Sequence, residues 1–324
     1  SSPDIEKLKE ELQFFNSLSL NSAEYTPKLP WKRVFIAEND RIIPSGNQIN
    51  AWESLCVSPE IGKLPGGHYP DFLNLLKSII PDTKAVGNHF SASLNSYDDS
   101  ASAQKIIVDK LSTLLVNFIQ TEKIRESELK VLEIGPGSGL FTKKWGKIIT
   151  DAEATFIDLY PLPRYNVTKK ERYVEQDAEE WLKYSSETFD IILSASTIQW
   201  FADPVGFIRQ AFHHLNPGGL LLVSTFLPGN LGELDGIRPA PVIYHTHAEF
   251  ERLCQGLSQE YLLDKEKIEV YFKSPRHALH HLRQTGVGHS PVKIKSRYEI
   301  EEALRLPDGS ARLTFFPLYI AIKK

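Results

Sequence analysis

The chain has 324 residues, of which 41% are hydrophobic and 24% charged, as expected for a soluble globular protein of about two domains. Its formal net charge of −4 argues against a nucleic-acid-binding protein. The longest apolar run, GLLLVSTFL, is too short to cross a bilayer, and the charged start SSPDIEKLKEELQFF is unlike a signal peptide. We therefore expect a cytoplasmic protein without a membrane partner, whose two cysteines, Cys56 and Cys254, are reduced thiols.

The N-terminal part of the chain predicts a small set of mixed elements. They are a helix at 4–15, a strand within 31–40, a helix at 45–55 with a Ser N-cap, and a short strand, glycine turn and helix within 60–80. Pro81 and Asp82 interrupt this pattern. We therefore expect a domain boundary near Lys84, which separates residues 1–84 from residues 85–324.

The second part of the chain alternates strands and helices. Helices are predicted at 102–120, from 138, and at 204–219, 247–257 and 275–286; strands are predicted at 129–135, 152–160, 172–178, 189–196, 220–226, 267–274 and 311–324. The strands are nearly continuous apolar runs, which is typical of a sheet covered by helices on both faces. We predict an α/β fold with a doubly wound, mostly parallel sheet.

A glycine-rich turn, EIGPGSG, follows the first strand of this sheet and precedes a helix. Glycine is required where the backbone turns sharply and a ligand packs against it. A dinucleotide fingerprint would place its third glycine at position 140, which is Leu140. The spacing G-x-G-x-G, preceded by an acid, is instead typical of enzymes that bind S-adenosylmethionine (SAM). The expected cofactor-binding residues of this turn are Glu133, Gly135, Pro136, Gly137 and Gly139.

Further candidates lie at the ends of the next strands, where ligands bind in such sheets. Asp158, followed by Leu159, ends the second strand, where an acid can accept both ribose hydroxyls. Asp177 ends the third strand and can accept from the adenine amino group, while the small Ala178 keeps the pocket open. Ser194 ends the fourth strand and completes the predicted cofactor site.

Four longer segments carry a more specific resemblance. They are HFSASLNSYDDSASAQ, SASTIQWFADP, NPGGLLLVSTFLPGNLGEL and HLRQTGVG, which are spread over residues 85–324. This part resembles class I SAM-dependent methyltransferases and, within them, the malonyl-acyl-carrier-protein O-methyltransferases of biotin synthesis, which have a seven-stranded sheet and a helical cap. The resemblance implies methyl transfer from SAM, which leaves S-adenosylhomocysteine (SAH), to the carboxylate of a malonyl thioester on acyl carrier protein. The alternative is a class I methyltransferase that acts on another carboxylate or a small molecule.

The reaction needs no general base, because a carboxylate is already ionised at neutral pH. The resemblance assigns Tyr97 to a segment that covers the active site, where it would act as a lid or an orienting hydroxyl. Gln199 and Trp200 follow the fourth strand, where the methyl acceptor is expected, and Arg283 is our candidate for clamping the acceptor carboxylate. The alternatives are core packing for Tyr97 and Trp200, and a solvated surface position for Arg283.

The C-terminal segment 265–324 is positively charged, with twelve Lys or Arg against six Asp or Glu. It could dock the acidic acyl carrier protein through the cationic residues Lys273, Arg276, Lys293, Lys295 and Arg297. The alternative is a solvated face without a partner. The pairs His213–His214 and His280–His281 lack a third ligand, so we expect surface residues and no metal site.

The segment before the boundary resembles the end of an α/β-hydrolase, specifically the pimeloyl-acyl-carrier-protein methyl ester esterase of the same pathway. The shared motifs are ENDRIIPSGNQ and GGHYPDF, which contain Asp40 and His68 in the chain order of a Ser-Asp-His triad. The serine motif G-x-S-x-G does not occur in this chain. We therefore expect a partial, inactive esterase segment, whose partner could be the missing upstream portion. The alternative is an extension specific to the methyltransferase.

Overall fold

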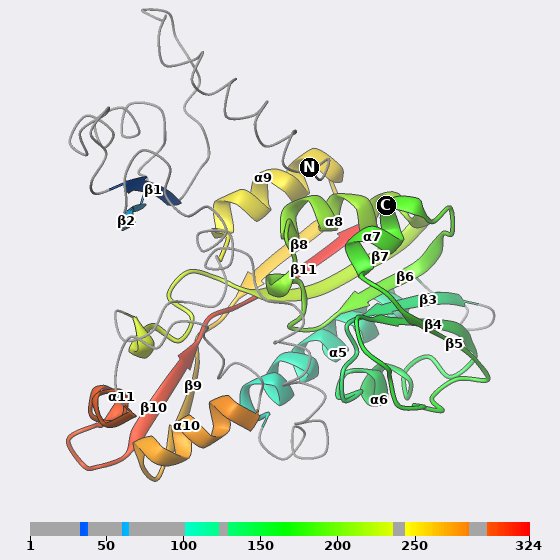
Figure 1. Ribbon diagram of the computed structural model, residues 1–324. Coiled ribbons are helices and arrows are strands. Elements are labelled where there is room, and N and C mark those ends of the chain that lie inside the picture. The colour runs from blue at the N-terminus through cyan, green and yellow to red at the C-terminus, as the bar shows by residue number, and fades with distance from the viewer. Residues whose placement is uncertain (1–32, 38–59, 65–100, 123–128, 236–243, 285–296) are drawn as a thin grey trace, which may run out of the picture. The chain divides into compact units, whose positions relative to one another are not determined.

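The computed structural model describes residues 33–37, 60–64, 101–122, 129–235, 244–284 and 297–324 (Figure 1). The chain divides into two compact units, residues 1–77 and 78–324. In the first unit, β1 (Arg33–Ala37) pairs in parallel with β2 (Glu60–Leu64), which confirms the strands predicted there. The helices predicted at 4–15 and 45–55 lie outside the described residues.

The second unit is built on a seven-stranded sheet with the order β5-β4-β3-β6-β7-β11-β8. The strands are β3 (Leu129–Ile134), β4 (Ala152–Asp158), β5 (Lys170–Glu175), β6 (Phe189–Ser194), β7 (Leu215–Phe226), β8 (Tyr261–Lys265) and β11 (Pro317–Lys323). The first five strands of this order pair in parallel, and β11 is antiparallel to both β7 and β8. The predicted doubly wound, mostly parallel sheet is therefore confirmed.

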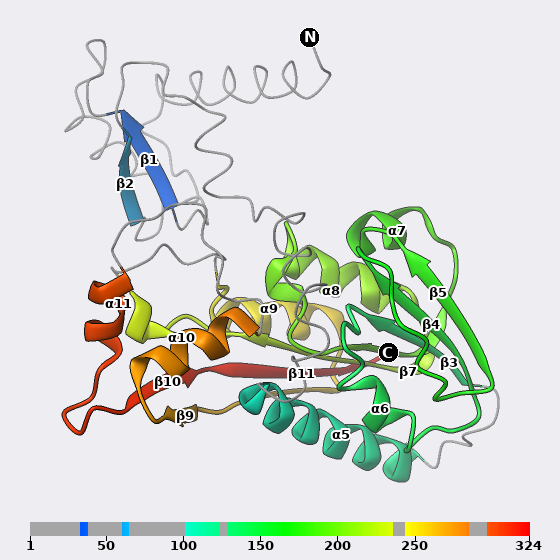
Figure 2. The same cartoon turned by 60° about the horizontal axis from the view of Figure 1, so that its bottom comes forward.

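Helices cover both faces of this sheet (Figure 2). Helices α5 (Ser102–Glu122) and α6 (Thr142–Trp145) lie on one face, and α7 (Ala178–Tyr184), α8 (Pro204–His213) and α9 (His247–Leu257) lie on the other. Successive side chains of a strand point to opposite faces. Val131 accordingly packs in the core under α5, whereas Leu132 packs in the core under α8. This alternation explains why the central strands are continuous apolar runs.

Several predicted boundaries differ from the structure; for example, β5 ends at Glu175, so Asp177 lies beyond the third strand that it was predicted to end. Helix α8 ends at His213, and β7 begins at Leu215 because Leu215 already pairs with Phe189; residues 216–219 then bulge before the pair Ile191–Leu220. The predicted strand 311–324 is two strands, β10 (Ala311–Phe315) and β11. Phe316 interrupts it, because its backbone N–H donates to the Asn230 side chain and its carbonyl accepts from Leu227.

A cap extends beyond the carboxyl ends of the parallel strands. It consists of β9 (Ile268–Phe272), which is antiparallel to β10, together with α10 (Pro275–Gln284), α11 (Arg297–Leu304) and the short helix η2 (Gly232–Leu234). Both views show this cap at one end of the large sheet (Figures 1 and 2). The first residue of β11, Pro317, pairs with Phe226 at the end of β7, which places β10 past that edge.

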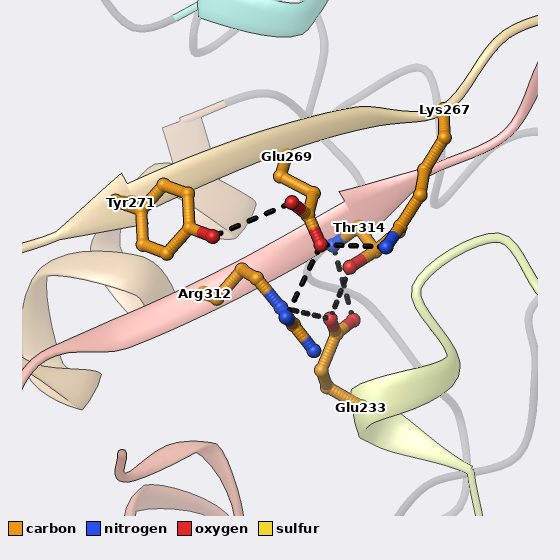
Figure 3. Close-up of polar contacts among 6 residues, drawn as sticks. All are labelled: Glu233, Lys267, Glu269, Tyr271, Arg312 and Thr314. Atoms are coloured by element: carbon orange, nitrogen blue, oxygen red, sulfur yellow. Dashed lines mark hydrogen bonds and ion pairs between the residues drawn. The ribbon is translucent and has the colours of Figure 1, made fainter. Parts of the chain in front are cut away.

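A polar network ties the cap to the chain that follows β7 (Figure 3). Glu233 of η2 accepts hydrogen bonds from the backbone N–H of Thr314 at 3.1 Å and from the Thr314 hydroxyl. Arg312 bridges two carboxylates, with Nε 3.4 Å from Glu233 and Nη1 3.1 Å from Glu269. Lys267 adds a 2.7 Å ion pair to Glu269, so both cations lower the pKa of that carboxyl. The network therefore couples η2 to both cap strands.

The structure bears on two predicted absences, of a membrane-spanning helix and of a metal site, only for the residues that it describes. None of the described helices has the length and apolar character that a bilayer crossing requires. Within the described ranges, no cluster of three or more His, Cys, Asp or Glu side chains could hold a metal ion. The surface prediction is wrong for His281, which is 5% exposed and packs against the rings of Phe272 and Phe315.

Candidate active site

The glycine turn between β3 and α6 adopts left-handed backbone conformations at three positions. The φ angles are +65° at Gly135, +56° at Gly137 and +78° at Gly139. A Cβ atom at Gly135 would overlap Thr197, and one at Gly139 would overlap the ring of Tyr165, whereas one at Gly137 would meet no atom within 4 Å. Gly135 and Gly139 must therefore be glycines because neighbouring side chains leave no room for a Cβ atom. The backbone of Gly137, in contrast, is open to a ligand. Pro136, within the turn, is buried.

Glu133 is buried at the end of β3, with 1% of its surface exposed. Its Oε2 accepts hydrogen bonds from Thr142 Oγ1 and Trp145 Nε1, both at 2.7 Å. Burial raises the pKa of this carboxyl to about 7, although the two hydrogen bonds oppose the shift. The side chain therefore holds α6 against the strand, and its predicted contact with the cofactor remains a prediction.

Asp158 lies at the end of β4, beside the glycine turn. Its Oδ2 accepts a hydrogen bond from the backbone N–H of Gly137 at 3.3 Å. Burial raises the pKa of Asp158 to about 6, opposed by backbone N–H donors of Gly137, Leu159 and Tyr160. Next to it, Leu159 exposes 36% of its apolar surface. A carboxylate beside exposed apolar surface is suited to a nucleoside, whose sugar carries hydroxyls and whose base is flat and apolar on its faces.

The sequence reasoning missed Tyr165. This tyrosine follows β4 in an irregular segment, and its hydroxyl donates a hydrogen bond to the carbonyl of Gly137 at 2.7 Å. Its ring packs against Phe156 and Tyr173, with ring centroids 5.0 and 5.9 Å away. Its own backbone N–H donates to the hydroxyl of Tyr173 at 2.8 Å. No local pattern predicts these contacts, because they join residues that only the sheet brings together.

Asp177 is the N-cap of α7. Its Oδ1 accepts from the backbone N–H groups of Glu179 at 2.8 Å and Glu180 at 3.1 Å. The adjacent Ala178 is buried in the core on the face of the sheet that α7, α8 and α9 cover. The predicted acceptance from an adenine amino group would fall to Oδ2 and remains a prediction. The capping sequence itself, an Asp followed by two acids in the first turn, could have predicted α7.

The residues at the end of β6 and just after it differ in their roles. Ser194 is fully buried, and its hydroxyl donates to the carbonyl of Ile134 at 2.9 Å, so it joins β6 to β3. Gln199 lies in a short helix, η1 (Ile198–Trp200), where its Nε2 donates to the carbonyl of Ser196 at 2.6 Å. Its Oε1 is buried without a hydrogen-bond partner, which leaves an acceptor at the edge of the sheet. Trp200, the last residue of η1, is half-buried.

The remaining candidates do not join this cluster in the described structure. Arg283 is exposed in the last turn of α10 and has no described contact with the glycine turn. Tyr97 lies outside the described residues, as do Asp40 and His68. Their assigned roles remain predictions.

The described residues fit the adenosyl part of SAM. The open backbone at Gly137 lies beside the carboxylate of Asp158, and the side chain of Leu159 adds exposed apolar surface. All three lie at the carboxyl edge of β3 and β4, where ligands bind in doubly wound sheets.

Comparisons with known proteins identify the family and the fold. A family model described as a methyltransferase domain matches residues 103–261. The malonyl-[acyl-carrier protein] O-methyltransferase of Porphyromonas gingivalis is 34% identical over 253 residues, covering 75% of this chain and 96% of that protein. Its counterpart from Bacteroides fragilis is 28% identical over 335 residues, covering 99% of this chain but 66% of that protein. The YcgJ protein of Bacillus subtilis shares the fold, with a TM-score of 0.50 and 15% identity over 67% of this chain and 98% of that chain.

Proposed function

This chain belongs to the malonyl-[acyl-carrier protein] O-methyltransferase family, and we propose that it methylates the free carboxylate of a malonyl thioester carried by acyl carrier protein. It is a SAM-dependent O-methyltransferase. The site observation that carries the proposal is the Asp158 carboxylate, held beside the open backbone of Gly137. The ester product would mask the negative charge of the malonyl group for chain elongation toward biotin.

The chain's own residues position the reactants. SAM, when bound, supplies a methyl group attached to a positively charged sulfur. Gly137 would lie along the cofactor, Asp158 would accept from the ribose hydroxyls, and Asp177 would accept from the adenine amino group. The acceptor carboxylate is already ionised, so the protein needs to orient it, and no general base is required.

Burial also assists the reaction. As the carbon–oxygen bond forms and the carbon–sulfur bond breaks, the negative charge of the acceptor and the positive charge of the sulfonium disappear together. A site that excludes water therefore favours the transition state over the separated charges. Gln199, with its buried and unpartnered Oε1, and Trp200 lie at the end of β6, where the acceptor would approach.

The proposal is tested by measuring methyl transfer from labelled SAM to malonyl-acyl carrier protein, malonyl-coenzyme A and free malonate. We expect the highest kcat/KM with the carrier-protein thioester. An enzyme that binds SAH but methylates none of the three would contradict the proposed substrate.

The proposed partner surface is the positive C-terminal segment. Lys273 and Arg276 are exposed around the start of α10, whereas Lys293 and Lys295 lie outside the described residues and Arg297 begins α11. Because exposed charge pairs are screened by salt, turnover on malonyl-acyl carrier protein should fall with ionic strength. Turnover on a small malonyl thioester should change little. Equal salt dependence for both substrates would contradict the proposal that this surface docks the carrier protein.

We also propose that residues 1–84 are a partial esterase segment. The support is the parallel pairing of β1 and β2, with Ala37 opposite Leu64, because Asp40 and His68 follow these strand ends by three and four residues. The B. fragilis relative matches along this segment too, whereas the P. gingivalis match covers 75% of the chain.

The variants Asp40→Asn and His68→Asn should leave methyl transfer within about twofold of the unmodified enzyme. Restored ester hydrolysis on adding an upstream esterase fragment would confirm the segment's origin, and no hydrolysis would favour a methyltransferase-specific extension.

A further inference from the structure

A buried glutamine near the start of α5 has an amide oxygen that the fold leaves without a partner. Gln104 is 6% exposed, and its Oε1 is buried with no hydrogen bond to any described residue. Buried polar groups are nearly always hydrogen-bonded, because an unsatisfied one destabilises the folded state. An exception on an element that reaches the active-site edge of a sheet therefore indicates a ligand.

Two ion pairs establish where Gln104 lies along the sheet. Glu122, at the end of α5, pairs with Lys323 at 2.9 Å, at the edge where the parallel strands begin. Lys110 pairs with Asp264 at 2.8 Å, near the edge where they end. Gln104 precedes Lys110 by six residues, or about 9 Å along a helix, so it lies past the carboxyl edge.

The helix also determines which way Gln104 points. The buried residues Val108, Leu111 and Leu115 follow it at four, seven and eleven positions, on the face of α5 that packs on the sheet. At Gln104 the sheet has ended, and α5 contacts β9 of the cap instead. On one side this part of α5 pairs with β8 through Lys110 and Asp264, and on the other side Asp109 pairs with Lys144 of α6, the helix that follows the glycine turn. Gln104 therefore lies past the carboxyl edge, between the cap and the helix of the glycine turn, at the edge where ligands bind in such sheets.

We propose that Gln104 binds the carboxylate of the methyl acceptor through its side-chain amide, an assignment that rests on the proposed function. No hydrogen bond among the described residues holds this amide in one orientation, so rotation about its last side-chain bond can turn the NH₂ group toward a carboxylate. A neutral donor orients the carboxylate without removing the negative charge that makes it a nucleophile. A cation would stabilise that charge in the ground state more than in the transition state, where it is disappearing.

The test compares two variants at this position with a control on the same helix. In Gln104→Leu the KM for malonyl-acyl carrier protein should rise at least tenfold, while the Kd for SAH stays within twofold. Its Tm should be unchanged or higher, because leucine removes an unsatisfied polar group. Gln104→Glu should be impaired further, since its charge repels the acceptor. Gln120→Leu, at an exposed position of α5, should behave as the unmodified enzyme.

The possible outcomes distinguish acceptor binding by Gln104 from cofactor binding and from a purely structural role. A Gln104→Leu enzyme with unmodified kcat and KM would overturn the assignment, as would a tenfold weaker affinity for SAH with an unchanged KM, which would place Gln104 at the cofactor. A lower Tm together with unchanged KM would show a purely structural role. If the unmodified enzyme does not methylate malonyl thioesters, the proposed function fails first, and that result is visible before any variant is compared.

Discussion

The carboxylate of Asp158 and the backbone of Gly137 are joined by a hydrogen bond of 3.3 Å across the turn between two neighbouring strands. Tyr165 holds the same glycine from its other side, by donating to its carbonyl at 2.7 Å. The most open position of the glycine turn is thus held at both its N–H and its C=O. This arrangement keeps the turn in place for a ligand that contacts Gly137 and Asp158 together.

The pKa of Asp158 predicts how SAH affinity depends on pH. The ionised carboxylate accepts ribose hydroxyls best, and its pKa is about 6. Between pH 7 and pH 5 most of the ionised form is lost, so the Kd for SAH should rise about tenfold. The variant Asp158→Asn should bind SAH weakly at both pH values, as measured by calorimetry. A pH dependence that persists in the variant would assign it to another group.

The raised pKa of Asp158 also predicts that removing its charge stabilises the fold. Burial raises the pKa of Asp158 above its ordinary value of 3.8, so the folded state binds the proton more tightly than the unfolded state. The destabilising effect of the buried charge is therefore complete above about pH 6 and disappears as the pH falls toward 3.8. At pH 7, Asp158→Asn should stabilise the fold by about 1–3 kcal/mol. Thermal unfolding at pH 7 and pH 5 tests this, and a lower Tm at pH 7 would contradict it.

Two glycines offer a matched pair for the role of Gly137. Gly137 and Gly218 have positive φ angles of +56° and +79°, and a Cβ at either position would meet no atom within 4 Å. Both Gly→Ala variants should lose about 1–2 kcal/mol of stability from backbone strain. Only Gly137→Ala should weaken SAH binding, by tenfold or more, because its methyl group would occupy space beside Asp158. Equal SAH affinity in the two variants would show that the ligand does not approach Gly137.

Tyr165 should act through the position of the glycine turn. Tyr165→Phe removes the hydrogen bond to Gly137 but keeps the ring packed edge-on against Phe156 and stacked on Tyr173. We expect a loss of about 1 kcal/mol in unfolding free energy and a three- to tenfold weaker affinity for SAH. The control is Tyr184→Phe, because Tyr184 is 72% exposed at the end of α7. If both variants bind SAH equally, the Tyr165 hydroxyl has no positioning role.

Glu133 should contribute mainly to stability. Glu133→Ala leaves Thr142 and Trp145, both fully buried, without their acceptor, at a cost of about 2–4 kcal/mol. Glu133→Gln keeps an acceptor oxygen and should unfold within about 1 kcal/mol of the unmodified protein. Its relative stability should improve as the pH rises through 7, because the raised pKa of Glu133 makes its ionised form unfavourable. Urea unfolding at pH 6 and pH 8 measures both effects.

Breaking the polar network of the cap should reduce turnover of the acceptor without changing the affinity for the cofactor product SAH. Glu233→Gln removes the charge that Arg312 pairs with, while Glu302→Gln removes a more exposed partner of Arg305 on α11. Because η2 is coupled to the cap strands through Glu233, the first variant should lower kcat/KM for the acceptor severalfold with SAH affinity unchanged. The second should have little effect on either quantity. Weaker SAH binding in Glu233→Gln would contradict this separation.

Much of the methyltransferase fold is predictable from periodicity, but short or exposed elements are not. The central strands β3, β4 and β6 are continuous apolar runs and were predicted within one or two residues. Strand β8, at the edge of the sheet, has only half-buried and exposed positions and was missed. The break at Phe316 was also missed, because β10 pairs with β9 and β11 pairs with β7, and only these long-range partners separate the two strands.

Local sequence patterns identified the glycine turn and the acids at the strand ends, because such sites depend on short motifs placed after apolar strands. Most of the side-chain roles depend on the folded structure. Ser194 joins two strands and Glu133 holds α6 because their partners come from elsewhere in the fold, whereas the capping role of Asp177 follows from its neighbours in the sequence. Tyr165 lies 28 residues from Gly137, and Gln104 acquires its place from ion pairs that involve β8 and β11. Packing brings these distant side chains to one edge of the sheet, and no local pattern encodes that proximity.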